Sequence, residues 1–230
     1  MESASLPSPG VVVGIDGSRW ALNAALWATD EAVSRGVPLR LVYVVEPRIG
    51  DRFDAQEASR DLARADIAIR QARVALESTE QPVKIEWQVV HGEPAEVLLN
   101  ASETADMLCV GAFGISHEVG DRRPGSTATA LSATARCPVA VIGSDRGPYI
   151  PAGRVVAGVD GTPGSAHVLN VASDEAELRG AELTILDPSL PGRHLGLNVV
   201  GFHTDPIQLL VIAQQGNEVR DVACPVLICR

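Results

Sequence analysis

At 230 residues, the chain is long enough for one large domain or for two modest ones that each bury a core. Its formal net charge of -10 argues against sequence-independent binding to nucleic acid or to an anionic membrane, since both need a basic surface. The longest apolar runs have the length of strands, and the N-terminus lacks a signal region, so we expect a cytoplasmic protein without a membrane span.

Strand-like and helix-like segments alternate along the first 143 residues. The first segment, Val11-Val-Val-Gly-Ile15, is continuously apolar, as is typical of a strand that a parallel sheet buries on both faces. The alternation predicts an α/β fold with a doubly wound, Rossmann-like sheet of five parallel strands. We expect strands at 11–15, 39–45, 84–90, 106–110 and 138–142, and helices at 19–35, 55–78, 95–104 and 126–136.

Periodicity also predicts which large side chains are buried. Trp20, Trp27 and Trp87 fall at positions expected in the core or at an interface, not on a base-stacking platform. The charges between Asp51 and Arg73 alternate in sign and indicate a solvated helix face. The apolar face of that helix comprises Ala58, Leu62, Ala65, Ile69, Ala72 and Leu76.

A glycine-rich loop follows the fourth predicted strand. Gly111 and Gly114 come directly after an apolar run, and Gly125-Ser126-Thr127 opens an alanine-rich helix. Glycines let the backbone approach an anion closely, and the free amides of a helix's first turn point at negative charge. The order therefore predicts a phosphate-binding site, although a purely structural turn would have the same pattern. The spacing is neither the Walker A pattern nor Gly-x-Gly-x-x-Gly.

The strand pattern begins again in the last third of the chain. Val155-Val-Ala-Gly-Val-Asp160 repeats Val11-Val-Val-Gly-Ile-Asp16 at an offset of 144 residues, and the register continues without a gap. Two copies of one unit are therefore predicted. The residues that recur further along are Ala28, Asp30, Glu31, Ala32, Arg35, Gly36 and Leu39, matched by Ala172, Asp174, Glu175, Ala176, Arg179, Gly180 and Leu183.

The two predicted copies differ in length. We place the first at 9–146 and the second at 153–230, with the boundary in the Gly/Pro-rich connector 144–153. Cys137-Pro-Val recurs as Cys224-Pro-Val at an offset of only 87 residues, so the second copy is truncated. The missing residues include the glycine loop, and only the first copy could hold an anion there.

No set of catalytic or metal-ligating residues stands out. His91 could act as a general base, but it lies in a predicted turn with no nucleophile or carboxylate within reach in the sequence. Asp16 and Asp160 follow the first strand of each copy and could simply cap helices, although for Asp16 a cap is compatible with ligand contact. The four cysteines lie in or beside apolar runs without a Cys-x-x-Cys pair, so we expect buried reduced thiols.

Taken together, these motifs resemble the universal stress protein family in its tandem bacterial form, with a degenerate second domain. The resemblance rests on Gly-x2-Gly-x9-Gly-Ser/Thr, on Val-Gly-Ile-Asp16-Gly-Ser18, on Val90-His-Gly-Glu-Pro94 and on Cys137-Pro-Val-Ala-Val. It covers 11–143 and, in degraded form, 155–230.

The loop departs from the family pattern. Ten residues, 115–124, separate its last two glycines, where the family usually has nine. Glu118 and Asp121 bring negative charge to the place where phosphates would lie, and Arg122 and Arg123 could offset that charge.

The resemblance implies an ATP site at the carboxyl ends of the strands, where this fold class places ligands. Asp16 would meet the ribose or adenine end, with Gly14 beside it, and the backbone at Val44 and Val110 would meet the base. ATP would bind with or without Mg. The residues that would surround the phosphates are Gly111, Phe113, Gly114, Gly125, Ser126 and Thr127.

The resemblance favours an ATP-binding stress-response protein that acts through ligand-dependent loop order or association, not a dedicated enzyme. Its partners would be the adenine nucleotide and, in a homodimer or an intramolecular pseudo-dimer, a second copy of the domain. One alternative is a nucleotide-free scaffold whose copies pack through the Cys-Pro-Val edge strands, as family dimers do. Another, an adenylating or pyrophosphatase enzyme, would need a Ser-Gly-Gly-x-Asp-Ser loop where this chain has Gly14-Ile-Asp16-Gly-Ser18.

Overall fold

The computed structural model describes residues 9–47, 55–115, 123–143, 153–186, 207–213 and 224–230. The strands are β1 (Val11–Ile15), β2 (Leu39–Val45), β3 (Ile85–His91), β4 (Met107–Gly111), β5 (Val139–Ile142), β6 (Arg154–Gly158), β7 (Glu182–Leu186), β8 (Ile207–Ala213) and β9 (Val226–Cys229). The helices are α1 (Arg19–Arg35), α2 (Ala55–Glu77), α3 (Pro94–Ala101), α4 (Ser126–Thr134) and α5 (Ser165–Arg179).

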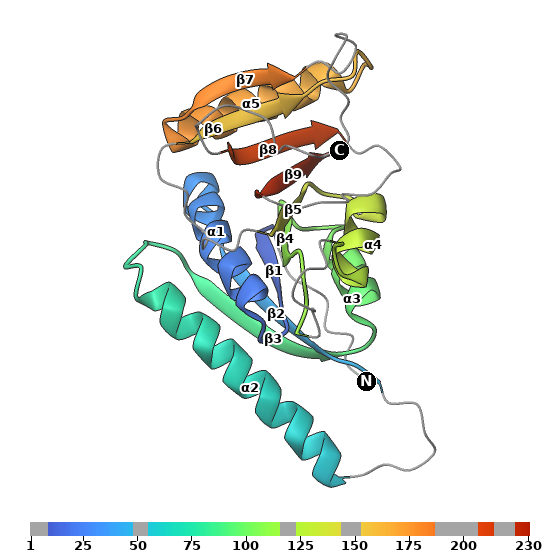
Figure 1. Cartoon of the computed structure of the whole chain (residues 1–230). Helices are drawn as coiled ribbons and strands as arrows, with labels where there is room; N and C mark the ends of the chain where they lie inside the picture. Colours follow the sequence, from blue (N-terminus) through green and yellow to red (C-terminus); the bar gives the residue numbers. More distant parts are fainter. Residues whose placement is uncertain (1–8, 48–54, 116–122, 144–152, 187–206, 214–223) are drawn as a thin grey trace.

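These strands form one sheet in the order β3-β2-β1-β4-β5-β9-β8-β6-β7 (Figure 1). Neighbouring strands are parallel except β5 and β9, which pair antiparallel with Val139 opposite Ile228 and Val141 opposite Val226. We call the part from β1 to β5 the first half and the part from β6 to β9 the second half. The chain thus has an α/β fold with a mainly parallel sheet, and its halves meet edge to edge.

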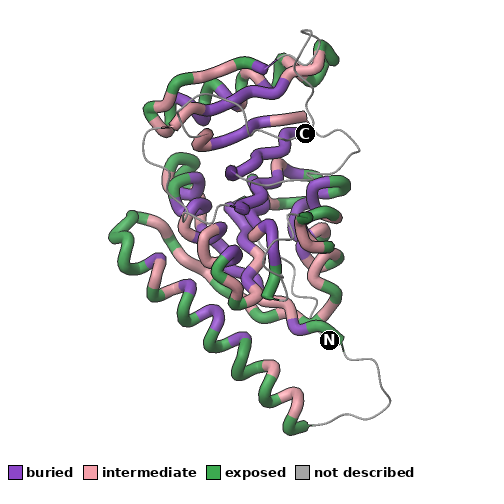
Figure 2. Tube along the Cα trace, viewed as in Figure 1, coloured by how far each residue is buried: buried purple, intermediate pink, exposed green. Residues whose placement is uncertain are grey.

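Two layers of helices cover the sheet (Figure 1). The side of the sheet under α1, α2 and α5 has one core, to which these helices contribute Trp27, Ile69 and Val168. The other side has a second core, to which α3 and α4 contribute Leu98 and Leu131. Figure 2 shows the buried residues concentrated on the strands between these layers.

The predicted strands and helices of the first half all form, with ends that differ by at most three residues. α1 and α5 both end at a glycine in the left-handed conformation, Gly36 (φ 64°) and Gly180 (φ 58°), which leaves room for the turn that closes each helix. The two helices thus end in the same way at glycines that are 144 residues apart.

The N-terminal caps differ from the sequence interpretation. The Ser18 hydroxyl caps α1 by accepting a hydrogen bond from the Ala21 amide (3.1 Å), and Asp16 Oδ1 accepts from the Ser18 amide (2.8 Å). Gly164 is the cap residue of α5, whereas Asp160 accepts from the Thr162 amide within the preceding turn. Neither aspartate is the helix cap, because in each case the helix begins too far along the chain.

The predicted apolar face of α2 is buried only in part: Ala58 is half-buried, and the prediction is wrong for Leu62. The buried residues of this helix begin at Ala65, and Leu62 is 50% exposed. Figure 2 shows that the first turns of α2 carry no buried residue. A helix of this length spans roughly 34 Å, whereas a strand as long as β2 spans roughly 23 Å. The first turns of α2 therefore extend beyond the strands that could cover them.

Of the three tryptophans, two are in the core. Trp20 and Trp27 are buried, but Trp87 is 51% exposed, so a core position is wrong for Trp87. It lies on β3, which is the last strand at its edge of the sheet, and the Arg73 guanidinium lies 3.9 Å from its ring centre. Periodicity predicts which face of the sheet a side chain occupies, but not whether another strand lies beside its own in the sheet.

The remaining structural predictions have mixed outcomes. The four cysteines are buried and unpaired, as expected. His91 is the exposed last residue of β3 instead of part of a turn. No helix among the described residues is long and apolar enough to cross a bilayer. The predicted connector, apart from Gly153, and the loop residues Glu118, Asp121 and Arg122 lie outside the described residues.

Candidate functional site

A cleft of about 860 Å³ opens at the carboxyl ends of β1, β2 and β4. β1 lies between β2 and β4, and the chain leaves it toward β2 through α1, so the cleft is at the point where the strand order reverses. Open α/β sheets place their ligands at this position. The structure brings all ten predicted site residues to this cleft: Gly14, Asp16, Val44, Val110, Gly111, Phe113, Gly114, Gly125, Ser126 and Thr127.

Two of the glycines allow close packing beneath the cleft. A Cβ atom on Gly111 would lie 2.7–2.8 Å from backbone atoms of Trp20 and Ala21, at the start of α1. One on Gly14 would lie 3.0 Å from a methyl group of Leu98. These glycines are required by the protein itself, because α1 and α3 pack directly against the ends of the strands.

The other two glycines face space that the described residues leave open. Among the described residues, a Cβ atom on Gly114 would meet only Asp16 Oδ2, at 3.4 Å, and one on Gly125 would lie 3.8 Å from the carbonyl oxygen of Ala112. Neither glycine has a left-handed backbone, and Gly125 has φ -62°. The described neighbours would therefore accept a larger residue at either position and do not explain why glycine is present there.

The N-terminus of α4 faces this open space. Its cap residue, Gly125, has no side chain to accept hydrogen bonds from the first turn, and its own amide donates to the Ala112 carbonyl oxygen at 2.8 Å. The amides of Ser126 and Thr127 have no partner within the helix and carry the positive end of its dipole. In α1, by contrast, the Ser18 hydroxyl already occupies a first-turn amide. α4 can therefore donate hydrogen bonds to an anion.

Charge is distributed unevenly in the cleft. Asp16 and Glu46 bring carboxylates from the ends of β1 and β2, and Arg123 brings a guanidinium group beside the start of α4. Burial, followed by the negative charge of Asp16, raises the pKa of the Tyr43 hydroxyl, which stays protonated and able to donate. One end of the cleft thus carries groups that can accept hydrogen bonds, while the other carries positive charge.

Part of the lining was not predicted from the sequence. Tyr43, Glu46, Pro94 and Leu98 all line the cleft, and Leu98 is buried. The first two lie next to Val44 at the end of β2, so the position of that strand end was the available signal. Of the two α3 residues, Pro94 ends the Val90-His-Gly-Glu-Pro94 motif and Leu98 lies one turn further along the helix, where its apolar side chain fits the pattern of an ordinary core residue.

Phe113 lines the cleft but is mostly buried. Its ring packs edge-on against Trp20, with ring centres 5.0 Å apart and planes at 65°. This contact holds the loop after β4 against α1. Phe113 therefore positions the backbone of the loop, between Gly111 and Gly114, and offers a ligand little side-chain surface.

The second half lacks this arrangement among its described residues. Residues 112–138 connect β4 to β5, whereas only 214–225 connect β8 to β9. The described lining of the cleft comes from the first half. At the equivalent strand end, Asp160 accepts hydrogen bonds from the hydroxyl groups of Thr162 (2.6 Å) and Ser165 (3.0 Å).

Residues 10–143 match the universal stress protein family, and the chain belongs to this family. Universal stress protein Rv3134c of Mycobacterium tuberculosis is 46% identical over 182 residues, which are 77% of this chain and 64% of that protein. Universal stress protein Rv2028c of the same organism is 41% identical over the same shares. This chain thus spans about 64% of the length of these curated relatives.

The fold also matches a solved structure along nearly its whole length. The crystal structure of a universal stress protein from Archaeoglobus fulgidus aligns with a TM-score of 0.68, covering 96% of this chain and 98% of that chain. Their sequences are 14% identical, so this likeness concerns the fold alone.

Proposed function

We propose that this protein binds ATP in the first-half cleft and acts as a cytoplasmic regulatory protein of the stress response. The observation that carries the proposal is that the uncapped start of α4 opens onto the same cleft as the carboxylates at the ends of β1 and β2. An adenine nucleotide has matching chemistry, since its ribose hydroxyls donate hydrogen bonds and its phosphates accept them.

In this proposal each part of the cleft receives one part of ATP. The base lies against the apolar lining at Val44 and Val110, and the ribose hydroxyls donate to Asp16. The phosphates occupy the space over Gly114 and Gly125, where the first-turn amides and Ser126 and Thr127 donate hydrogen bonds. Arg123 adds positive charge.

Magnesium would be held mainly by the phosphate oxygens. The described residues contain no group of three or more His, Cys, Asp or Glu side chains that could hold a metal ion. Mg²⁺ commonly keeps several waters and takes only one or two carboxylates beside substrate phosphates. Asp16, in the cleft, could supply such a carboxylate.

We further propose that binding, not turnover, is the activity. Among the described residues that line the cleft there is no His, Cys or Lys, and the ionisable groups there are Asp16, Tyr43, Glu46 and Arg123. General acid–base catalysis at neutral pH needs a group that titrates near that pH, or a nucleophile activated by one. ATP would instead order the loop after β4, and the ordered loop would be read by other molecules.

The second half is proposed to be a truncated copy of the same domain that binds no nucleotide. Its strand order β7-β6-β8-β9 parallels β2-β1-β4-β5, and α5 follows β6 as α1 follows β1. The domains would then span 9–146 and 153–230. The short β8–β9 connection supports the loss of the site in the second copy.

Two measurements on the full chain test this function. Native mass spectrometry of the freshly purified protein is expected to show one adenine nucleotide per chain. Titration calorimetry of the nucleotide-free protein is expected to give one site per chain for ATP. No heat at concentrations up to about 1 mM, a range that detects even weak binding, would contradict the proposal and favour the nucleotide-free scaffold.

A further inference from the structure

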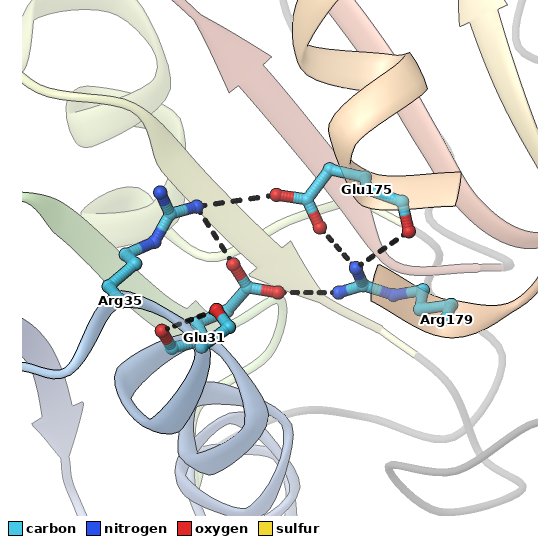
Figure 3. A network of polar contacts seen from close by, with 5 residues as sticks. Glu31, Arg35, Glu175 and Arg179 are labelled. Carbon is cyan, nitrogen blue, oxygen red and sulfur yellow. Dashed lines mark hydrogen bonds and ion pairs between the residues drawn. The ribbon is translucent and has the colours of Figure 1, made fainter. Parts of the chain in front are cut away.

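Four charged side chains meet between α1 and α5, where the two halves join (Figure 3). Glu31 and Arg35 lie one turn apart on α1, and Glu175 and Arg179 lie one turn apart on α5. Arg35 Nη2 donates to Glu31 Oε2 (2.9 Å) and Glu175 Oε1 (3.3 Å). Arg179 donates to Glu31 Oε1 (2.6 Å) and also pairs with Glu175. We call these residues the quartet.

Most of the quartet is buried, so its charges affect the stability of the junction. The exposed fractions are 0% for Glu31 and 3% for Glu175, and the Arg179 side chain is 10% exposed. Arg179 also lies over the Trp27 ring, 5.1 Å from its centre. Removing one member of a buried ion pair is costly, because it leaves an uncompensated charge away from water. The Arg35 side chain is 36% exposed, so it is the member of the quartet that water reaches most easily. A partner that places a like charge opposite Glu31 or leaves it unpaired would therefore weaken the junction.

The contacts have the pattern of a twofold axis. Glu175 and Arg179 are the residues that follow Glu31 and Arg35 at the 144-residue repeat. Each arginine binds the glutamate one turn before it and the glutamate of the other half. Exchanging the two halves leaves this set of contacts unchanged, as in an isologous interface. A helix that carries Glu-x-x-x-Arg here is thus complementary to a second copy of itself.

The rest of the junction is less selective for the partner that binds there. β5 and β9 pair through their backbones, and main-chain hydrogen bonds can form with almost any extended strand. Rejection of wrong partners generally comes from like charges brought together at an interface. Within the described junction, the quartet is where such charges face each other across the halves.

We propose that the quartet is the recognition element of this junction. The surface formed by α1 and β5 accepts a unit of the same fold whose first helix carries Glu and Arg four residues apart, and it rejects a unit with those charges reversed. The second half is the unit that occupies this surface here. The first half of another copy carries the same two residues and takes this place when the second half is released.

Charge reversal in the full chain at pH 8 tests the proposal. The double variant Glu175→Arg with Arg179→Glu keeps the attraction within α5 but places like charges opposite α1. We expect the amides shared by β5 and β9 to exchange with solvent at least about tenfold faster, since a junction weakened by 1.4 kcal/mol opens tenfold more often. We also expect a larger dimer fraction than in the original chain, measured by sedimentation.

Reversing all four charges provides the decisive comparison. Adding Glu31→Arg and Arg35→Glu restores the attractions within the quartet with the signs inverted, so exchange of these amides and the dimer fraction should return most of the way to the original values. The interactions of Arg179 with the Trp27 ring and with the Asp30 carboxylate are not restored. The matched control reverses the exposed pair Asp66 and Arg70, also one turn apart on α2, and should change neither quantity.

Three outcomes of these exchange and sedimentation measurements would overturn the proposal or part of it. Unchanged exchange in the one-sided variant would overturn the proposal, because the junction would then be indifferent to charge. Failure of the fourfold reversal to restore slow exchange would overturn it as well, because the quartet would only be filling space. Faster exchange without a larger dimer fraction would overturn the part that assigns the first half of a second copy as a partner.

Discussion

The two halves share a framework but differ in what connects its strands. In both, a buried strand leads through a turn into a helix that ends at a left-handed glycine, Gly36 or Gly180. Only the first half has a long connection between its last two strands, residues 112–138, and only there is the cleft found among the described residues. The comparison teaches that the framework positions the strand ends, whereas the loop between them creates the site.

The largest expected effect concerns the open glycines of the first half. Gly114→Val and Gly125→Val should each weaken ATP binding at least about 100-fold, or roughly 2.7 kcal/mol, because the new side chain would fill the space over α4. Both backbones are compatible with valine, so thermal unfolding should change little. The matched control is Gly164→Val, at the cap of α5, which should leave affinity unchanged. Calorimetry and thermal melts check these values, and undiminished ATP affinity in both first-half variants would refute the site.

A second comparison uses equivalent positions at the strand ends. Gly111→Ala should destabilise the protein by about 2–3 kcal/mol, because the methyl group overlaps the α1 backbone. Met107 pairs with Val11 as Leu209 pairs with Val155, so Ala213 occupies on β8 the position that Gly111 occupies on β4. Ala213 already carries that methyl group, and Ala213→Gly should cost only about 0.5–1 kcal/mol. Urea unfolding measures both. Equal effects would mean that α1 and α5 pack against their strands in the same way.

The aspartates at the two strand ends provide a third comparison. Asp16→Ala should weaken ATP binding about tenfold, or 1.4 kcal/mol, because the ribose hydroxyls lose a charged acceptor. Asp160→Ala should leave the affinity unchanged, since its carboxylate accepts hydrogen bonds in the turn and at the start of α5, away from the cleft. Calorimetry measures both affinities. An equal loss in the two variants would contradict the assignment of nucleotide binding to the first half.

The sequence predicts the strand ends well, and the site follows from them. Apolar runs fix where β1 and β4 stop, and parallel strands stop at the same edge, so Asp16 and Gly111 had to lie close together. The same reasoning could not distinguish Tyr43 and Leu98, as residues that line the cleft, from ordinary core residues. Their side chains also fit a core pattern, and only the packing of α3 across the strand ends brings Leu98 to the cleft.

The contacts between the two halves could not be predicted from the sequence as well as the strand ends could. The recurrence of Glu31 and Arg35 was visible, but in one dimension it indicates only a duplication. The antiparallel pairing of β5 with β9 is what brings α1 and α5 face to face. Trp87 shows the same limit at the other edge of the sheet, since its exposure depends on which strand comes last.

The smallest expected effect is a dependence of stability on pH that arises in the second half. Burial raises the pKa of Glu175 to about 7, and the nearby Glu31 carboxylate adds to the shift, while Arg179 and Arg35 oppose it. The folded state therefore binds this proton more tightly than the unfolded state, in which the carboxyl group titrates near its ordinary value of 4.5. Its contribution is fully present below that value and is lost as pH rises through about 7.

We expect the unfolding free energy to fall by about 1 kcal/mol between pH 5 and pH 7.5 through this group, well below the full linkage value because the four charges compensate one another. Glu175→Gln, which is neutral at every pH, should remove that slope, whereas Glu182→Gln on β7 should keep it, because that side chain is exposed. Urea unfolding at several pH values measures the slope. A slope that survives Glu175→Gln would show that another group carries it and would contradict the assignment to Glu175.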